Sequence, residues 1–98
     1  MKKVALIGYG AIARIMLDRL AENDPDGSVE ISAVLVRENR LEETRAAFGS
    51  TTQIVSGIEE IFAISPDVIV ECAGQGAVAQ FGEAVLNAGF DFMIISTG

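Results

Sequence analysis

A glycine-rich segment near the start of the chain is the strongest chemical signal in the sequence. The spacing G-x-G-x-x-A occurs in the run Gly8-Tyr9-Gly10-Ala11-Ile12-Ala13. In such a run the first glycine permits a tight turn, the second lets a pyrophosphate approach the backbone, and the small third residue lets a helix pack closely on a strand. The N–H groups that open this helix also favour an anion. The run therefore predicts dinucleotide binding, with a purely structural turn as the alternative.

A second set of candidate residues follows the next predicted strand, where a dinucleotide-binding fold reads the adenosine ribose. An acid at this place favours NAD, whereas this chain has Val36-Arg37-Glu38, with Arg40 close by. A guanidinium can pair with the 2′-phosphate of NADP, so Arg37 favours NADP. NAD stays possible if Glu38 reaches the ribose. The alternative for Arg37 and Arg40 is that both are solvated loop charges.

A second glycine-rich turn, Glu71-Cys72-Ala73-Gly74-Gln75-Gly76, follows the fourth predicted strand. In a Rossmann sheet the first and fourth strands are neighbours, so this turn is expected to face the nicotinamide side of the cofactor. Cys72 could be a nucleophile, but the chain has no histidine to activate it, and a buried structural thiol is the commoner role. Glu71 is either a functional carboxylate or a polar residue at the strand end. No residue is assigned a catalytic role.

The elements that must position these residues follow from the apolar pattern, in which short apolar runs alternate with longer amphipathic ones. The predicted strands are Val4–Ile7, Ile31–Val36, Thr51–Val55, Val68–Ala73 and Phe92–Ser96. The predicted helices are Ala11–Glu22, a segment from Asn39 through Phe48 with Asn39 and Glu42 as a capping pair and Gly49 as its stop, a segment capped by Ser56 and Glu59, and Ala77–Ala88 with Gly89 as its stop. This alternation predicts an α/β fold, a doubly wound parallel sheet of Rossmann type with strand order 3-2-1-4-5.

Composition excludes several other classes of protein. The 98 residues include 7 Lys and Arg against 14 Asp and Glu, a net charge of −7, and no basic residue follows Arg45, so no nucleic-acid surface is expected. One cysteine and no histidine exclude an internal disulfide and a metal site of Cys and His ligands. The first apolar run is too short for a signal peptide or a membrane span, so no membrane partner and a cytoplasmic location are expected.

Three stretches of the sequence resemble the N-terminal half of the L-aspartate dehydrogenase family. They are Lys3–Ala13, Val70–Val78 with its E-C-A-G-Q-x-A-V pattern, and Ile94–Gly98. The resemblance implies an oxidoreductase that transfers a hydride from C2 of L-aspartate to NAD or NADP and so forms iminoaspartate. It also implies that Gly8, Gly10, Ala11 and Ile12 contact the pyrophosphate, and that Cys72, Ala73 and Gly74 line the nicotinamide pocket.

The same resemblance places the catalytic histidine and the substrate groups in a second, downstream domain. Residues 1–98 are therefore expected to be the NAD(P)-binding fragment of a longer two-domain enzyme, truncated after the fifth strand and inactive alone. The full-length enzyme is expected to bind L-aspartate through the second domain and to form a homo-oligomer. One rival is the cofactor domain of a homoserine dehydrogenase or dihydrodipicolinate reductase relative. The other is a nucleotide-sensing regulatory module that performs no chemistry.

Overall fold

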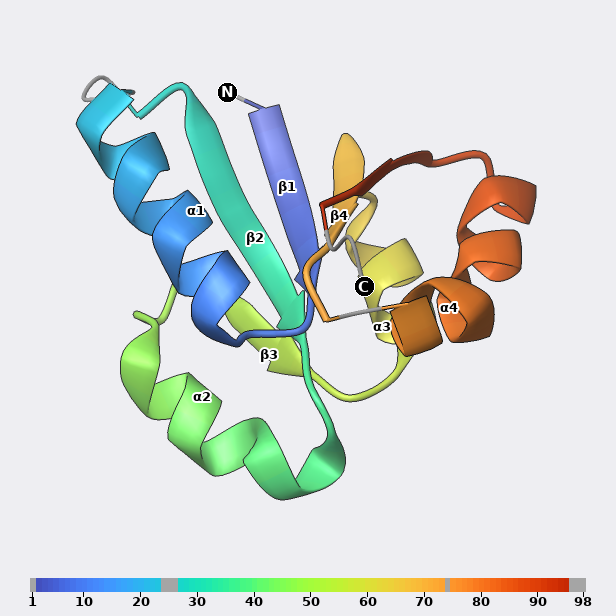
Figure 1. Cartoon of the computed structure of the whole chain (residues 1–98), viewed down its shortest axis with the longest axis horizontal. Helices are drawn as coiled ribbons and strands as arrows, with labels where there is room; N and C mark the ends of the chain where they lie inside the picture. Colours follow the sequence, from blue (N-terminus) through green and yellow to red (C-terminus); the bar gives the residue numbers. More distant parts are fainter. Residues whose placement is uncertain (1, 24–26, 74, 96–98) are drawn as a thin grey trace.

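A computed structural model describes residues 2–23, 27–73 and 75–95 and has a five-stranded parallel sheet at its centre (Figure 1). The strands are β1 (Lys2–Ile7), β2 (Val29–Leu35), β3 (Gln53–Val55), β4 (Val68–Glu71) and β5 (Asp91–Ile94). Their order is β3-β2-β1-β4-β5. The predicted Rossmann topology is confirmed. The strands β1 to β3 are added toward one edge of the sheet and β4 and β5 toward the other, so the strand order reverses at the boundary between β1 and β4.

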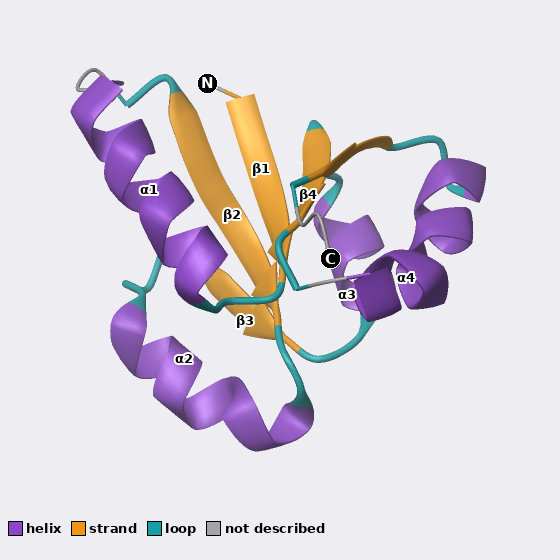
Figure 2. Cartoon of the chain, in the orientation of Figure 1, coloured by secondary structure: helices purple, strands orange, loops and turns teal. Residues whose placement is uncertain are grey.

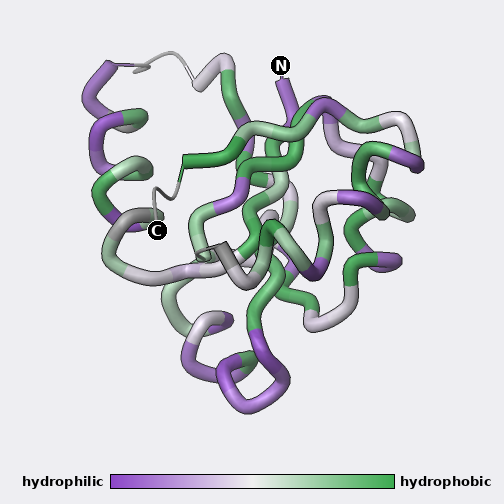
Figure 3. Tube along the Cα trace, turned by 45° about the vertical axis from the view of Figure 1, so that its right-hand side comes forward, coloured by the Kyte–Doolittle hydropathy of each residue, from purple (hydrophilic) through white to green (hydrophobic). Residues whose placement is uncertain are grey.

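Helices cover both faces of this sheet (Figure 2). One face carries α1 (Ala11–Asn23) and α2 (Leu41–Ala47), which follows a short 3-10 turn, η1 (Glu38–Arg40). The other face carries α3 (Ile58–Ile64) and α4 (Gln75–Asn87). Strands covered on both faces need apolar side chains at every position, which is why the central strands have continuous apolar runs instead of alternating ones. Figure 3 shows hydrophobic residues following the strands and hydrophilic residues on the outer turns of the helices.

The core consists of two layers, one on each side of the sheet. Successive side chains of β1 alternate between them: Val4 and Leu6 pack toward α1 and α2, whereas Ala5 and Ile7 pack toward α3 and α4. All four are buried. Burial of a side chain as large as leucine or isoleucine is worth about 1.5 to 3 kcal/mol, so the central strand is a rigid support for the turn that follows it.

The pairing of β2 with β1 is interrupted once. Val4 pairs with Ile31 and Ala5 with Ala33, so Ser32 is an extra residue with no partner in the register. The Ser32 side chain is buried, and its hydroxyl donates a hydrogen bond to the carbonyl oxygen of Val4 at 3.3 Å. Ser32 therefore forms a bulge, and its hydroxyl compensates for the interrupted ladder.

Several predicted details of the helix ends are wrong. Asn39 lies inside η1, so α2 continues from a turn already formed and its N-cap is Arg40, with no capping side chain. At α3 the N-cap is Gly57, again with no side-chain hydrogen bond. Gly49 does not have the positive φ of a left-handed stop, whereas Gly89 does, at 86°. The pairs Asn39/Glu42 and Ser56/Glu59 therefore have the sequence spacing of a capping box but do not form its hydrogen bonds at the starts of α2 and α3.

Candidate functional site

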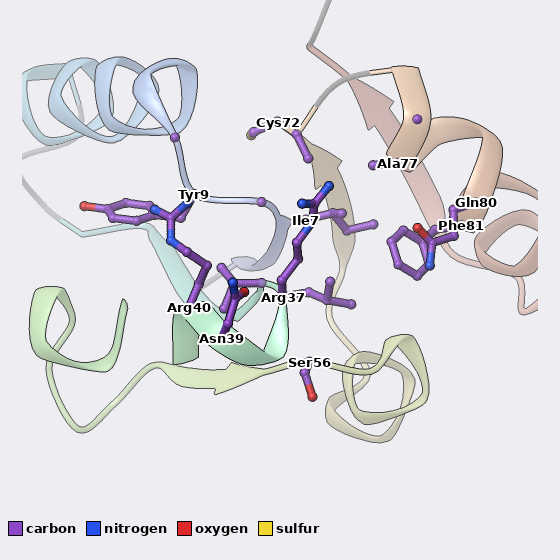
Figure 4. A pocket seen from close by; sticks show the side chains of 16 residues that line it. Ile7, Tyr9, Arg37, Asn39, Arg40, Ser56, Cys72, Ala77, Gln80 and Phe81 are labelled. Atoms are coloured by element: carbon purple, nitrogen blue, oxygen red, sulfur yellow. The ribbon is translucent and has the colours of Figure 1, made fainter. Parts of the chain in front are cut away.

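A cavity of about 760 Å³ opens at the carboxyl ends of the strands (Figure 4). Its walls are formed by the segments that follow β1, β2, β3 and β4 and by the first half of α4. This is the edge of a doubly wound sheet at which ligands bind, next to the point where the strand order reverses. The volume is in the range of small-molecule and cofactor sites.

Gly8 forms the floor of the cavity at the end of β1. Its φ of 93° is in the left-handed region, and its N–H donates to the carbonyl oxygen of Leu35 at 2.7 Å. A Cβ placed on Gly8 would lie 2.5 Å from the Cβ of Ala73 and 2.9 Å from its Cα. Only glycine satisfies both the backbone angle and this close approach, so the two glycine-rich turns predicted from the sequence are in contact.

Gly10 differs from Gly8 because it borders open space. A Cβ placed on Gly10 would meet no atom within 4 Å. The helix α1 begins at Ala11 directly afterwards, so the N–H groups of its first turn, including those of Ala11 and Ile12, lack the carbonyl partners that a helix interior supplies. Ala13 is fully buried in the core beneath them. The backbone at Gly10 is therefore open, which the approach of a pyrophosphate to this turn requires.

Two arginines give the cavity a positive wall in a domain of net charge −7. Arg37 and Arg40 both line it, and Figure 4 shows the Arg37 side chain extending into the cavity from the end of β2. Arg40 also forms an ion pair with Glu43. Glu38 lies between the two arginines in sequence but is exposed and is not part of the wall. No carboxylate is present among the described residues that line the cavity, which therefore favours an anion.

Tyr9 is a wall residue whose role the sequence does not predict. Its ring packs edge-on against Phe48, with centroids 4.9 Å apart, and the Arg14 guanidinium lies 5.3 Å from the ring centroid. These contacts connect the turn after β1 to the end of α2. Tyr9 is also the only tyrosine, and the chain has no tryptophan. Its fluorescence therefore reports directly on the cavity.

Besides Ile7 and Leu35 at the ends of β1 and β2, six more of the described wall residues are not singled out as site residues by the sequence. They are Asn39 and Ser56, which follow β2 and β3, and Gly76, Ala77, Gln80 and Phe81 on α4. Two polar residues placed just after strand ends, Asn39 and Ser56, are the signal that could have identified the first pair. For the α4 residues the sequence shows only a helix, because the direction of each side chain depends on how that helix packs.

Cys72 and Ala73 both line the cavity, whereas Gly74 lies outside the described residues. Cys72 is only 5% exposed, and burial together with the neighbouring Glu71 carboxylate raises the pKa of its thiol to about 11. The thiol is therefore protonated and unreactive at neutral pH, because the thiolate is the nucleophilic form. A structural role for Cys72 is favoured over that of a nucleophile.

The raised pKa of Cys72 predicts a loss of stability at high pH. The unfolded thiol releases its proton near pH 9.0, whereas the folded thiol keeps it to about pH 11. Over this interval the unfolded state binds fewer protons, so the free energy of unfolding falls as pH rises. Urea denaturation should show a steeper fall for the wild type than for Cys72→Ala, in which every other titrating group is unchanged. Parallel pH profiles would contradict the raised pKa.

Two kinds of feature are not found in the part of the chain that the structure describes. Residues 2–23, 27–73 and 75–95 contain no group of three or more His, Cys, Asp or Glu side chains that could hold a metal ion. Within the same residues, no helix has the length and apolar character needed to cross a membrane.

A doubly wound parallel sheet, a glycine turn between β1 and α1 and an anion-favouring cavity at the switch point together define a dinucleotide-binding domain of the Rossmann class. The chain belongs to the family described as homoserine dehydrogenase, NAD binding domain, whose sequence model matches residues 8–98. The prediction of NAD or NADP as the cofactor class is confirmed by this membership.

Curated relatives confirm the resemblance inferred from the sequence. The L-aspartate dehydrogenase of Serratia proteamaculans is 43% identical over all 98 residues, and that of Archaeoglobus fulgidus is 38% identical over 95 residues. The chain spans about a third of their length, 35% and 34%. A solved structure of dipicolinate-bound dihydrodipicolinate reductase from Paenisporosarcina sp. TG-14 superimposes with a TM-score of 0.78 at 21% sequence identity. The superposition covers the whole of this chain and 38% of the reductase chain. This likeness concerns the fold.

Proposed function

We propose that residues 1–98 are the NAD(P)-binding domain of a longer oxidoreductase that dehydrogenates L-aspartate. The observation that carries the proposal is the cavity beside Gly10, which has room for a pyrophosphate at the start of α1 and a wall with two arginines and no described carboxylate. Similarity to L-aspartate dehydrogenases along the whole chain supports the substrate. A homo-oligomeric state and a cytoplasmic location belong to the same proposal, and size-exclusion chromatography of the longer protein tests the first.

In this proposal the domain binds and orients the dinucleotide. A dinucleotide held here would supply an oxidised nicotinamide as the acceptor for the hydride on C2 of L-aspartate, and with loss of a proton from the amine the product would be iminoaspartate. The turn at Gly8 and Gly10 holds the pyrophosphate, and Cys72 and Ala73 form an uncharged wall beside it. The chain has no histidine and no basic residue after Arg45 to hold the two carboxylates of L-aspartate near β4 and β5. The substrate groups and the proton acceptor therefore belong to another part of the longer protein.

Tyr9 fluorescence tests dinucleotide binding by the 98-residue chain. Titration with NADPH should quench the emission in a saturable way, whereas nicotinamide alone, which lacks the phosphates, should not. A flat titration with a folded chain would overturn the proposal. For the activity, NADPH formation from L-aspartate should occur with the longer protein and not with residues 1–98. A longer protein that binds NADPH but produces none from L-aspartate would favour the sensor or a different substrate.

We further propose that the domain prefers NADP, since Arg37 extends into the cavity and Glu38 does not line it. Replacing Arg37 by aspartate should shift the ratio of the NADP and NAD dissociation constants toward NAD by about 1 to 3 kcal/mol, because a charged pairing to the 2′-phosphate is lost. Arg45→Asp is the matched control: Arg45 is exposed on α2 and does not line the cavity. An unchanged ratio in Arg37→Asp would make Arg37 a solvated loop charge.

A further inference from the structure

Glu71 is a fully buried carboxylate at the last position of β4. It pairs in register with Ile7 on β1 and with Ile94 on β5, so it lies in the interior of the sheet at the edge that carries the cavity. Two residues earlier, Ile69 is buried among apolar side chains. Burial of a carboxylate in such surroundings is costly unless hydrogen bonds compensate for it. The position therefore calls for a specific partner of the carboxylate.

A partner of Glu71 is the backbone of the turn that follows it. The Oε2 atom accepts a hydrogen bond from the N–H of Ala73 at 2.7 Å. Ala73 is the residue whose Cβ and Cα approach Gly8 so closely that no side chain fits there. Through this hydrogen bond the carboxylate acts on the contact between the two glycine-rich turns, and both turns line the cavity.

We propose that Glu71 is a positioning residue of the dinucleotide site, whose carboxylate holds the turn after β4 against the phosphate turn at Gly8. This proposal rests on the dinucleotide-binding function proposed above. Hydrogen bonds to a charged acceptor are short and about twice as strong as neutral ones, so the bond from Ala73 to Glu71 restrains the turn that contains Ala73. The raised pKa of the Cys72 thiol, to which the Glu71 charge contributes after burial, agrees with a carboxylate close to the cavity wall.

Three variants separate the reach of the side chain from its charge. Glu71→Gln keeps an oxygen acceptor at the same reach, Glu71→Asp keeps the charge but is one methylene shorter, and Glu71→Leu has neither. The NADPH dissociation constant, measured by Tyr9 fluorescence, should stay within about 3-fold of wild type for the Gln variant and rise by about 10-fold or more for the Asp and Leu variants, because only the Gln side chain keeps an acceptor within reach of the Ala73 N–H.

Ser32→Ala is the control for general loss of stability. Its hydroxyl is another buried group bonded to backbone, but Ser32 does not line the cavity. This variant should lower the midpoint of urea unfolding and leave the NADPH dissociation constant unchanged. If the Leu variant fails to fold, the Gln and Asp variants decide. Wild-type affinity in Glu71→Asp, or loss of affinity in Glu71→Gln, would overturn the positioning role, whereas a wild-type chain that binds no NADPH would overturn the proposed function itself.

Discussion

Replacing Gly10 by valine is expected to abolish dinucleotide binding and leave the fold intact. A Cβ on Gly10 meets no atom within 4 Å, so the protein itself has room for a side chain there. In the proposed function that room is the space in which the pyrophosphate approaches the backbone, and a branched side chain would fill it. Tyr9 fluorescence should show an NADPH dissociation constant at least about 100-fold higher than that of wild type, which corresponds to roughly 2.7 kcal/mol. The urea midpoint should change little.

Gly49→Val is the matched control for this substitution. A Cβ added to Gly49 would also meet no atom within 4 Å, and its φ is outside the left-handed region, but Gly49 is exposed and does not line the cavity. The control should bind NADPH as wild type does. Normal binding by Gly10→Val would instead mean that the glycine motif is only a structural turn.

Replacing Gly8 by alanine is expected to have the opposite consequence, a large loss of stability. The φ of 93° is strained for any residue with a side chain, and the new methyl group would lie 2.5 Å from the Cβ of Ala73. Backbone strain and overpacking each cost about 1 to 3 kcal/mol, so the free energy of unfolding should fall by about 2 to 6 kcal/mol. The whole free energy of unfolding of a small domain is only about 5 to 15 kcal/mol. Urea denaturation followed by circular dichroism measures the change.

Gly89→Ala separates the two contributions at Gly8. The φ of Gly89, 86°, is close to that of Gly8, but a Cβ added to Gly89 meets no atom within 4 Å, so the alanine adds only backbone strain. Gly8→Ala should therefore lose clearly more stability than Gly89→Ala. Equal losses in the two variants would show that the contact with Ala73 adjusts without cost, and that the two turns are not held in fixed positions.

The fold could be predicted because its signals are local. The run Val4–Ile7 and the glycine motif after it specify a strand, a turn and a helix in immediate succession, and the alternation of such units specifies a parallel sheet. Strand ends are predicted less accurately. The apolar pattern predicts one strand over residues 68–73, but β4 ends at Glu71 because Ala73 turns toward Gly8 to make the close contact. That contact joins residues 65 positions apart and has no local signal.

The candidate site divides in the same way. Gly10, Arg37 and Cys72 follow strand ends, where the topology alone predicts a ligand, and each of them lines the cavity. Gln80 and Phe81 could not be predicted, because they reach the cavity only through the packing of α4. For Glu71 the sequence leaves two interpretations open, and the burial of its side chain and the bond to Ala73 become apparent only in the structure.

The bulge at Ser32 has a consequence for insertions and deletions in this part of the chain. Since side chains alternate along a strand, one surplus residue would ordinarily exchange every later side chain between the two faces. Ser32 absorbs that surplus, so Ile31 and Ala33 still pack in opposite layers as adjacent residues would. A chain with Ser32 deleted would therefore keep the pairing of Ala33 and of every later residue of β2 with β1, and Arg37 would still follow β2 at the cavity.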